Sequence, residues 1–170
     1  VETAFMTAVN PCKEKSVSNY IYDLAEDVLP HVNLLDNCTI APFQMKVTSL
    51  ERRFVDKCFA ACDYYLKDTG SKRLSRHLYD LHKLLEIANL DNSLVDLFIE
   101  VKKQRAPYEY CPSAKGNVTL SKVLNQIIES DYYRNDYIEV TKLLLFEDII
   151  YEEVAASLND IICFLKDFGM

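Results

Sequence analysis

Two amphipathic segments joined by a short turn constrain this chain more than any other feature of its sequence. From Ser49 to the turn at 67–71, and again from that turn onwards, apolar side chains recur at the spacing of one helix face. The pattern predicts two helices, with Gly70 as the C-cap of the first and Ser71 as the N-cap of the second. The apolar positions that define the two faces are Phe54, Cys58, Ala61 and Tyr65, then Leu74, Leu78, Leu81, Leu85 and Ala88.

These two helices carry a lysine and an aspartate that the turn would bring together. Helices joined by so short a connection lie antiparallel or at a steep angle, so we expect Lys57 on the first to lie near Asp80 on the second. Such a pair is either an ordinary ion pair, worth about 0 to 1 kcal/mol when exposed, or part of a functional site. The residues alone leave both interpretations open.

Length and composition indicate one ordinary globular domain, or part of one. The 170 residues are 49% apolar, which is enough for a core. No apolar run is long enough to span a bilayer, and the N-terminus lacks the pattern of a signal peptide. We therefore expect a cytoplasmic protein that has no contact with a membrane.

The charge balance argues against a broad nucleic-acid-binding surface, because the net charge is −7 and the isoelectric point is about 5.0. The roles of three local groups of residues remain open. Tyr108 and Tyr110 either stack on a base or are ordinary half-buried aromatic residues. Two basic groups are either binding patches or solvated faces: Lys102, Lys103 and Arg105, and Lys67, Lys72, Arg73 and Arg76.

The six cysteines are scattered without the paired spacing of a zinc site. Cys58 and Cys62 share a helix face, and His77 and His82 lie on the next predicted helix, so a metal site is arithmetically conceivable. Buried free thiols are the usual state of such cysteines in a reducing compartment. We predict no metal site from these residues.

The chain before the two helices shows a small strand component. Residues 1–9 have partial alternation and β-branched residues, and residues 43–47 alternate apolar and polar side chains, so each predicts a strand. Between them a helix is expected over 20–28, capped by Ser16 or Ser18. The second strand leads directly into the Lys57 helix.

The rest of the sequence is helical in pattern and shows no internal repeat. The economical fold is therefore α+β and predominantly helical, with one compact helical unit over 49–170. Further helices are predicted over 94–101, 121–128, 137–146 and 151–168.

Two motifs resemble the AbiEii/AbiGii toxin family of nucleotidyltransferases. They are Glu51-Arg52-Arg53-Phe54-Val55-Asp56-Lys57-Cys58-Phe59-Ala60 and Ser75-Arg76-His77-Leu78-Tyr79-Asp80-Leu81. A basic segment at 101–105, an Asp-Tyr pair at 131–132 and a closing helix after Asp148 extend the resemblance over most of the chain. The resemblance implies a helical bundle with strands left from a truncated nucleotidyltransferase sheet over 1–48.

The resemblance also implies a chemistry and a set of site residues. It implies transfer of a nucleoside monophosphate from an NTP to a tRNA or protein acceptor, with Mg²⁺, in a phage-defence or toxin–antitoxin setting with an antitoxin partner. Lys57 would contact the nucleotide phosphates, and Asp80 would act as base, orienting group or partner of Lys57. Arg53 and Arg76 would assist in nucleotide binding, and Glu2 would match a further family carboxylate.

The same resemblance implies that this chain is inactive by itself. The sequence begins at Val1, inside an expected strand, which suggests a fragment. The family's Gly-Gly-x-Ser/Thr turn and its Asp-x-Asp-type carboxylate pair do not occur in it. We therefore expect no tightly bound Mg²⁺ or NTP here.

Two other functions fit parts of the sequence. The spacing from Arg76 to His82 is that of helical HEPN-type ribonucleases, in which an arginine and a histidine act on a scissile phosphate. A helical interaction module without chemistry is the second alternative. A Gly-Gly turn and a carboxylate pair encoded upstream of Val1 would favour the transferase over both.

Overall fold

A computed structural model describes residues 10–28, 41–68 and 70–170. The described residues form two compact units, one that ends at Ser49 and one that runs from Leu50 to the C-terminus. Glu2 and the predicted strand over 1–9 lie outside the described residues.

The first unit is a two-stranded antiparallel sheet with one helix. β1 (Cys12–Val17) pairs with β2 (Phe43–Thr48), and α1 (Tyr20–Val28) follows β1. The alternation that predicted β2 is confirmed. β1 was not expected, because its sequence Cys-Lys-Glu-Lys-Ser-Val has almost no apolar side chains to alternate.

The N-cap predicted for α1 is wrong. Asn19 caps the helix, because its Oδ1 accepts hydrogen bonds from the N–H groups of Ile21 at 3.1 Å and Tyr22 at 3.0 Å. Ser16, by contrast, is paired with Gln44 in the sheet.

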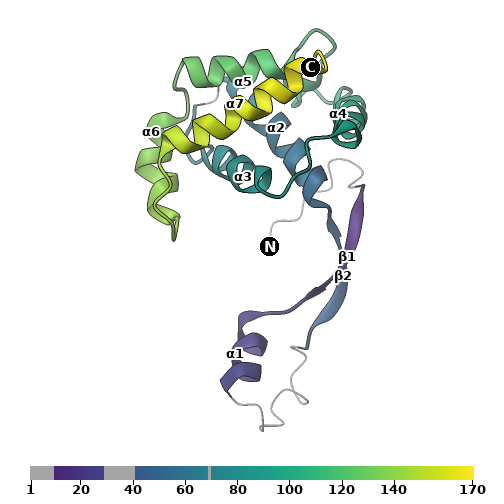
Figure 1. Ribbon diagram of the computed structural model, residues 1–170, viewed down its shortest axis with the longest axis vertical. Coiled ribbons are helices and arrows are strands. Elements are labelled where there is room, and N and C mark those ends of the chain that lie inside the picture. Colours follow the sequence, from purple (N-terminus) through teal and green to yellow (C-terminus); the bar gives the residue numbers. More distant parts are fainter. Residues whose placement is uncertain (1–9, 29–40, 69) are drawn as a thin grey trace. The chain divides into compact units, whose positions relative to one another are not determined.

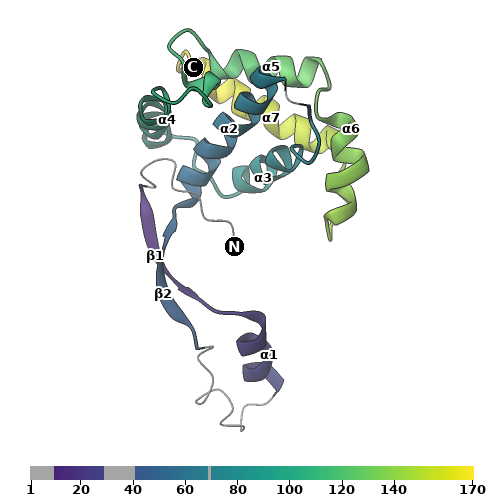
Figure 2. The same ribbon diagram turned by 180° about the vertical axis from the view of Figure 1, so that it is seen from behind.

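The second unit is a bundle in which four helices surround one core (Figures 1 and 2). α2 (Leu50–Lys67) packs against α3 (Arg76–Leu85) and α5 (Leu120–Glu129), and α7 (Tyr151–Asp167) packs against the same two helices. α4 (Asn92–Arg105) contacts α2 from outside this group. The predicted α+β fold with a mostly helical bundle is confirmed.

The predicted apolar faces form the core of this bundle. Phe54, Cys58 and Ala61 of α2 are fully buried, and Leu78 and Leu81 of α3 are buried against them. Burying a large apolar side chain stabilises a fold by roughly 1.5 to 3 kcal/mol, so these positions hold the two helices together. The stripe of α7 also faces the core, through Val154, Leu158, Ile161, Ile162 and Leu165.

The turn between α2 and α3 differs from the sequence prediction. α2 ends at Lys67, and Asp68 takes the left-handed conformation (φ 48°) in which Gly70 was expected to end the helix. α3 begins only at Arg76, so Ser71 is not its N-cap. The reason is the carboxylate of Asp136, which accepts hydrogen bonds from residues 73–75 and holds them in a turn.

The later helices agree with the prediction except in one segment. Asp91 caps α4 by accepting hydrogen bonds from the N–H groups of Ser93 and Leu94, and α5 and α7 lie where expected. The loop that follows α4 contains a short 3₁₀ turn, η1 (Pro112–Ala114). The expected helix over 137–146 is instead two short pieces, a π-helical turn η2 (Tyr137–Thr141) and a 3₁₀ turn η3 (Lys142–Leu144), which follow the short helix α6 (Arg134–Asp136).

No helix among the described residues is both long and apolar enough to cross a membrane.

Candidate functional site

Lys57 and Asp80 meet at the interface of α2 and α3. The Lys57 ammonium lies 2.5 Å from Asp80 Oδ2 and 3.4 Å from His77 Nδ1. About a third of each side chain of the ion pair is exposed. The proximity predicted from the two amphipathic helices is therefore confirmed, and the pair is neither fully solvated nor buried in the core.

A cavity of about 250 Å³ opens beside the Lys57 side chain. Lys57 and His77 line it, while Asp80 contacts Lys57 without being part of the cavity wall. One side of α2 forms most of the wall, because its residues at helical spacing face the same way. The wall consists of Asp56, Lys57, Ala60, Asp63, Tyr64 and Lys67 from α2, with His77, Arg105 and Tyr110.

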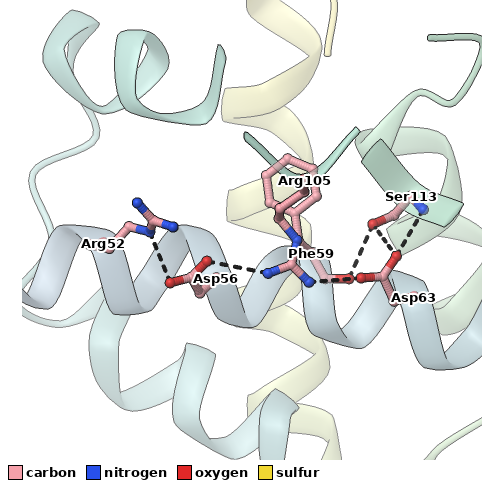
Figure 3. Close-up of polar contacts among 6 residues, drawn as sticks. All are labelled: Arg52, Asp56, Phe59, Asp63, Arg105 and Ser113. Atoms are coloured by element: carbon pink, nitrogen blue, oxygen red, sulfur yellow. Dashed lines mark hydrogen bonds and ion pairs between the residues drawn. The ribbon is translucent and has the colours of Figure 1, made fainter. Parts of the chain in front are cut away.

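Arg105 at the end of α4 ties that side of the cavity together (Figure 3). Its guanidinium donates to Asp63 Oδ2 at 2.8 Å and to Asp56 Oδ1 at 3.4 Å, and it lies over the ring of Phe59. Arg52, which is fully buried, donates to the other oxygen of Asp56 at 2.9 Å. Because Arg105 is held by two carboxylates, its position in the wall is fixed before any ligand arrives.

Asp63 is the most heavily bonded carboxylate of this network. Its Oδ1 accepts hydrogen bonds from the N–H of Ser113 at 2.8 Å and from Ser113 Oγ at 2.6 Å, in addition to the Arg105 contact at Oδ2 (Figure 3). Asp63 thus joins α2 to the η1 turn and to α4.

His77 is held as a neutral ring beside Lys57. Burial, assisted by the positive charges of Lys57 and Arg76, lowers the pKa of His77 to about 4. Because an ammonium can only donate, Nδ1 accepts from Lys57 and the ring proton lies on Nε2, which is buried without a hydrogen-bond partner among the described residues. The ring also stacks on Tyr64, with 5.5 Å between the ring centroids.

The described residues do not fit a Mg²⁺ site at this cavity. Both oxygens of Asp63 and both oxygens of Asp56 already accept hydrogen bonds from protein groups, and Asp80 is paired with Lys57. In the described ranges, no group of three or more His, Cys, Asp or Glu side chains could hold a metal ion. Cys58 and Cys62 are fully buried, and burial raises the pKa of both thiols.

The other residues predicted for the site lie elsewhere. Arg53 is exposed on α2, and Arg76 lines a different cavity together with Arg73. His82 contacts Ser157 Oγ of α7 at 2.7 Å, so the arginine and histidine of the ribonuclease alternative have different surroundings. Tyr108 and Tyr110 stack on each other, with 5.2 Å between the ring centroids.

Sequence reasoning missed Arg105, Asp63 and Ser113 as members of one network. Arg105 was predicted within a basic patch, but its charge is engaged by Asp56 and Asp63, and Lys102 donates to the carbonyl of Val118. The one signal in the sequence is that Asp56, Lys57, Asp63 and Tyr64 repeat at a seven-residue interval, which places them on one helix face.

The fold and the site together define a class of protein. It is a helical bundle with a cavity lined by two lysines, Lys57 and Lys67, and by Arg105, whose charge is paired with Asp56 and Asp63 of the same wall. The family model described as "Nucleotidyl transferase AbiEii toxin, Type IV TA system" matches residues 1–162. The chain therefore belongs to the AbiEii family of nucleotidyltransferase toxins, and an antitoxin partner is implied by that membership. Searches of curated proteins and of solved structures gave no match.

Proposed function

We propose that this chain binds the phosphates of an NTP through Lys57 and serves a nucleotidyltransferase toxin in which a nucleoside monophosphate is transferred to an RNA or protein acceptor. The observation that carries the proposal is the placement of the Lys57 ammonium, which Asp80 and neutral His77 hold at the wall of a cavity that Lys67 also lines. Family membership supports the same activity.

The contacts of Lys57 suit a phosphate ligand. An ammonium has three N–H donors; Asp80 and His77 accept from it, which leaves a donor for a ligand in the cavity. A compact point charge held in this way attracts phosphate oxygens without needing to reorganise. Lys67, whose ammonium lies 5.8 Å from the centre of the Tyr64 ring, adds a second cation at the wall.

The size of the cavity favours the phosphates over the whole nucleotide. Its volume of about 250 Å³ is below the roughly 300 to 1,000 Å³ typical of small-molecule sites. We propose that the remainder of the nucleotide and the Mg²⁺ ion are bound by the Gly-Gly and paired-carboxylate motifs of the family, which do not occur in these 170 residues. On this proposal the chain binds nucleotide weakly and does not catalyse transfer unaided.

Titration calorimetry with each of the four common NTPs tests the proposal. We expect weak binding of at least one NTP, and a loss of about tenfold or more in affinity for Lys57→Ala, because a charge-assisted contact to phosphate is worth about 1.5 to 3 kcal/mol. Lys103→Ala is the matched control, since Lys103 is exposed on α4 outside the cavity wall and should leave affinity unchanged.

Two outcomes of this titration would decide against the proposal. Equal affinities of the wild-type chain and Lys57→Ala would remove Lys57 from the site. No binding of any NTP at the highest usable concentration would favour the helical interaction module without chemistry.

A further inference from the structure

A second and larger cavity lies on the other side of the first turn of α3. It has a volume of about 420 Å³, with Arg73 and Arg76 on one wall and Glu139, Leu143 and Leu144 on the other. The second wall belongs to η2 and η3, and we call residues 137–148 the distal arm. Figures 1 and 2 both show this arm reaching beyond the ends of the neighbouring helices α3 and α7.

The distal arm carries a cluster of exposed apolar side chains. Leu143 and Leu144 are 76% and 75% exposed, and Phe146 is fully exposed. Isolated apolar residues are normal on a protein surface, but a cluster of three large ones within four positions is characteristic of an interaction surface. The proposed nucleotide site does not use these residues, because they lie outside its cavity.

The charges around this cavity have no ion-pair partner among the residues that the structure describes. Arg73, Arg76 and Glu139 line the same cavity, yet none of them makes an ion pair with a described residue. Further along the arm the acidic residues are compensated, Glu147 by Lys83 and Asp148 by Lys142. The cavity therefore has two arginines on one wall, and a glutamate together with two exposed leucines on the other.

We propose that this surface binds a second copy of the chain across a two-fold axis. A two-fold interface requires a surface that complements itself, because each residue meets a different residue of the same surface on the other copy. With the axis between the two walls of the cavity, the wall of each copy that carries Glu139, Leu143 and Leu144 faces the wall of the other copy that carries Arg73 and Arg76. The opposite charges then pair, and the exposed leucines are covered. A phosphate chain fits less well, since it would leave the exposed leucines in water.

Sedimentation velocity and light scattering over a range of protein concentrations test this interface. We expect the wild-type chain to approach twice its 19.6 kDa mass as concentration rises. Leu144→Asp should remain at the single-chain mass, because its charge would be buried in the interface. Ile87→Asp is the matched control, since Ile87 is also an exposed apolar residue but lies outside the distal arm, and it should associate like the wild type.

A charge exchange separates this interface from unspecific association. Arg73→Glu and Glu139→Arg should each weaken association about tenfold or more, and the double variant should recover most of it, because the exchanged charges again face each other across the axis. Far-UV circular dichroism and the melting temperature of each variant establish that it is folded.

The inference is overturned if the wild-type chain stays at the single-chain mass at every concentration. It is equally overturned if the chain associates but Leu144→Asp and both single charge variants do so too. Neither result bears on NTP binding at Lys57, because the two cavities are lined by different residues.

Discussion

The ammonium of Lys57 has two acceptors of different kinds, and the difference matters chemically. Asp80 supplies a full negative charge, whereas His77 supplies a lone pair on a neutral ring. A second carboxylate in place of the ring would neutralise more of the positive charge of Lys57 and repel an incoming phosphate. The neutral histidine orients the ammonium without adding a second negative charge to that of Asp80.

The lowered pKa of His77 predicts a specific pH dependence of stability. The pKa of His77 is about 6.5 in the unfolded chain and about 4 in the folded chain. Stability is therefore lost as the pH falls from 6.5 towards 4, by about 2 kcal/mol between pH 7 and pH 5. In His77→Asn, which keeps an oxygen acceptor for Lys57, this part of the pH dependence should disappear.

Urea unfolding of both proteins at pH 7 and pH 5 measures this effect. The quantity compared is the change in the free energy of unfolding between pH 7 and pH 5 in each protein. Any constant loss of stability caused by the lost stacking on Tyr64 therefore cancels. If the wild type and His77→Asn lose the same stability between pH 7 and pH 5, His77 is not held neutral by the fold.

At the scale of elements, the start of α3 depends on a side chain more than sixty positions away. The carboxylate of Asp136 accepts hydrogen bonds from the N–H groups of Arg73, Leu74 and Ser75 at 2.6, 3.0 and 2.9 Å. Ser75 Oγ also lies 2.7 Å from Thr141 Oγ1, so a second contact links this turn to η2. This turn fixes where α3 begins, and therefore where its residues His77 and Asp80 lie.

Replacing this carboxylate should destabilise the bundle strongly. An amide in Asp136→Asn can accept on one side only and would turn its own N–H groups towards backbone donors, which predicts a loss of about 2 to 4 kcal/mol in the free energy of unfolding. Asp131→Asn is the matched control, because Asp131 is exposed and makes only a surface ion pair with Arg134, and it should cost less than about 1 kcal/mol. Equal losses in the two variants would contradict the role of Asp136.

The same carboxylate should also contribute to acid sensitivity. Burial opposes its ionisation, but the hydrogen bonds from residues 73–75 lower the pKa of Asp136 below the ordinary value near 3.8. Its contribution to stability is therefore complete above about pH 4 and is lost as the pH falls further. Asp136→Asn should lack this acid limb when unfolding is followed by urea titration between neutral and strongly acidic pH.

These elements show what local sequence could and could not predict. The apolar spacing of Phe54, Cys58, Leu78 and Leu81 was enough to predict α2, α3 and the meeting of Lys57 with Asp80, because periodicity reports which face is buried. It could not predict where α3 begins, since Asp136 decides that from a distance. The break at η2 and η3 was also missed, because the periodic pattern of 137–146 continues through the π-helical turn.

At the scale of the whole molecule, long-range contacts were the part of the site that sequence could not supply. Lys57 and Asp80 are carried by consecutive helices, but Arg105 and Ser113 reach Asp63 from 42 and 50 positions away. Nothing in the local spacing fixes such contacts, because they depend on how α4 and η1 pack against α2. The fold class and the ion pair were predictable, whereas the network that fixes the cavity wall was not.

The two compact units should differ sharply in local stability. In the second unit α2 buries a row of apolar side chains, whereas no side chain of β1 or β2 in the first is fully buried. A two-stranded sheet without a buried face is marginal in water, since hydrogen bonds alone do not offset the loss of chain entropy. The described residues of the first unit are therefore stabilised by little packing of apolar side chains.

Amide hydrogen exchange measured by mass spectrometry tests this difference within one sample. We expect peptides from β1 and β2 to exchange at least about a hundredfold faster than peptides from α2 and α7, because opening the sheet exposes little apolar surface. The bundle peptides are the internal reference, so no second protein is needed. Protection of β1 and β2 equal to that of α2 would contradict the expectation and would require further backbone partners along the open edges of the sheet, since the pairing of β1 with β2 cannot supply such stability by itself.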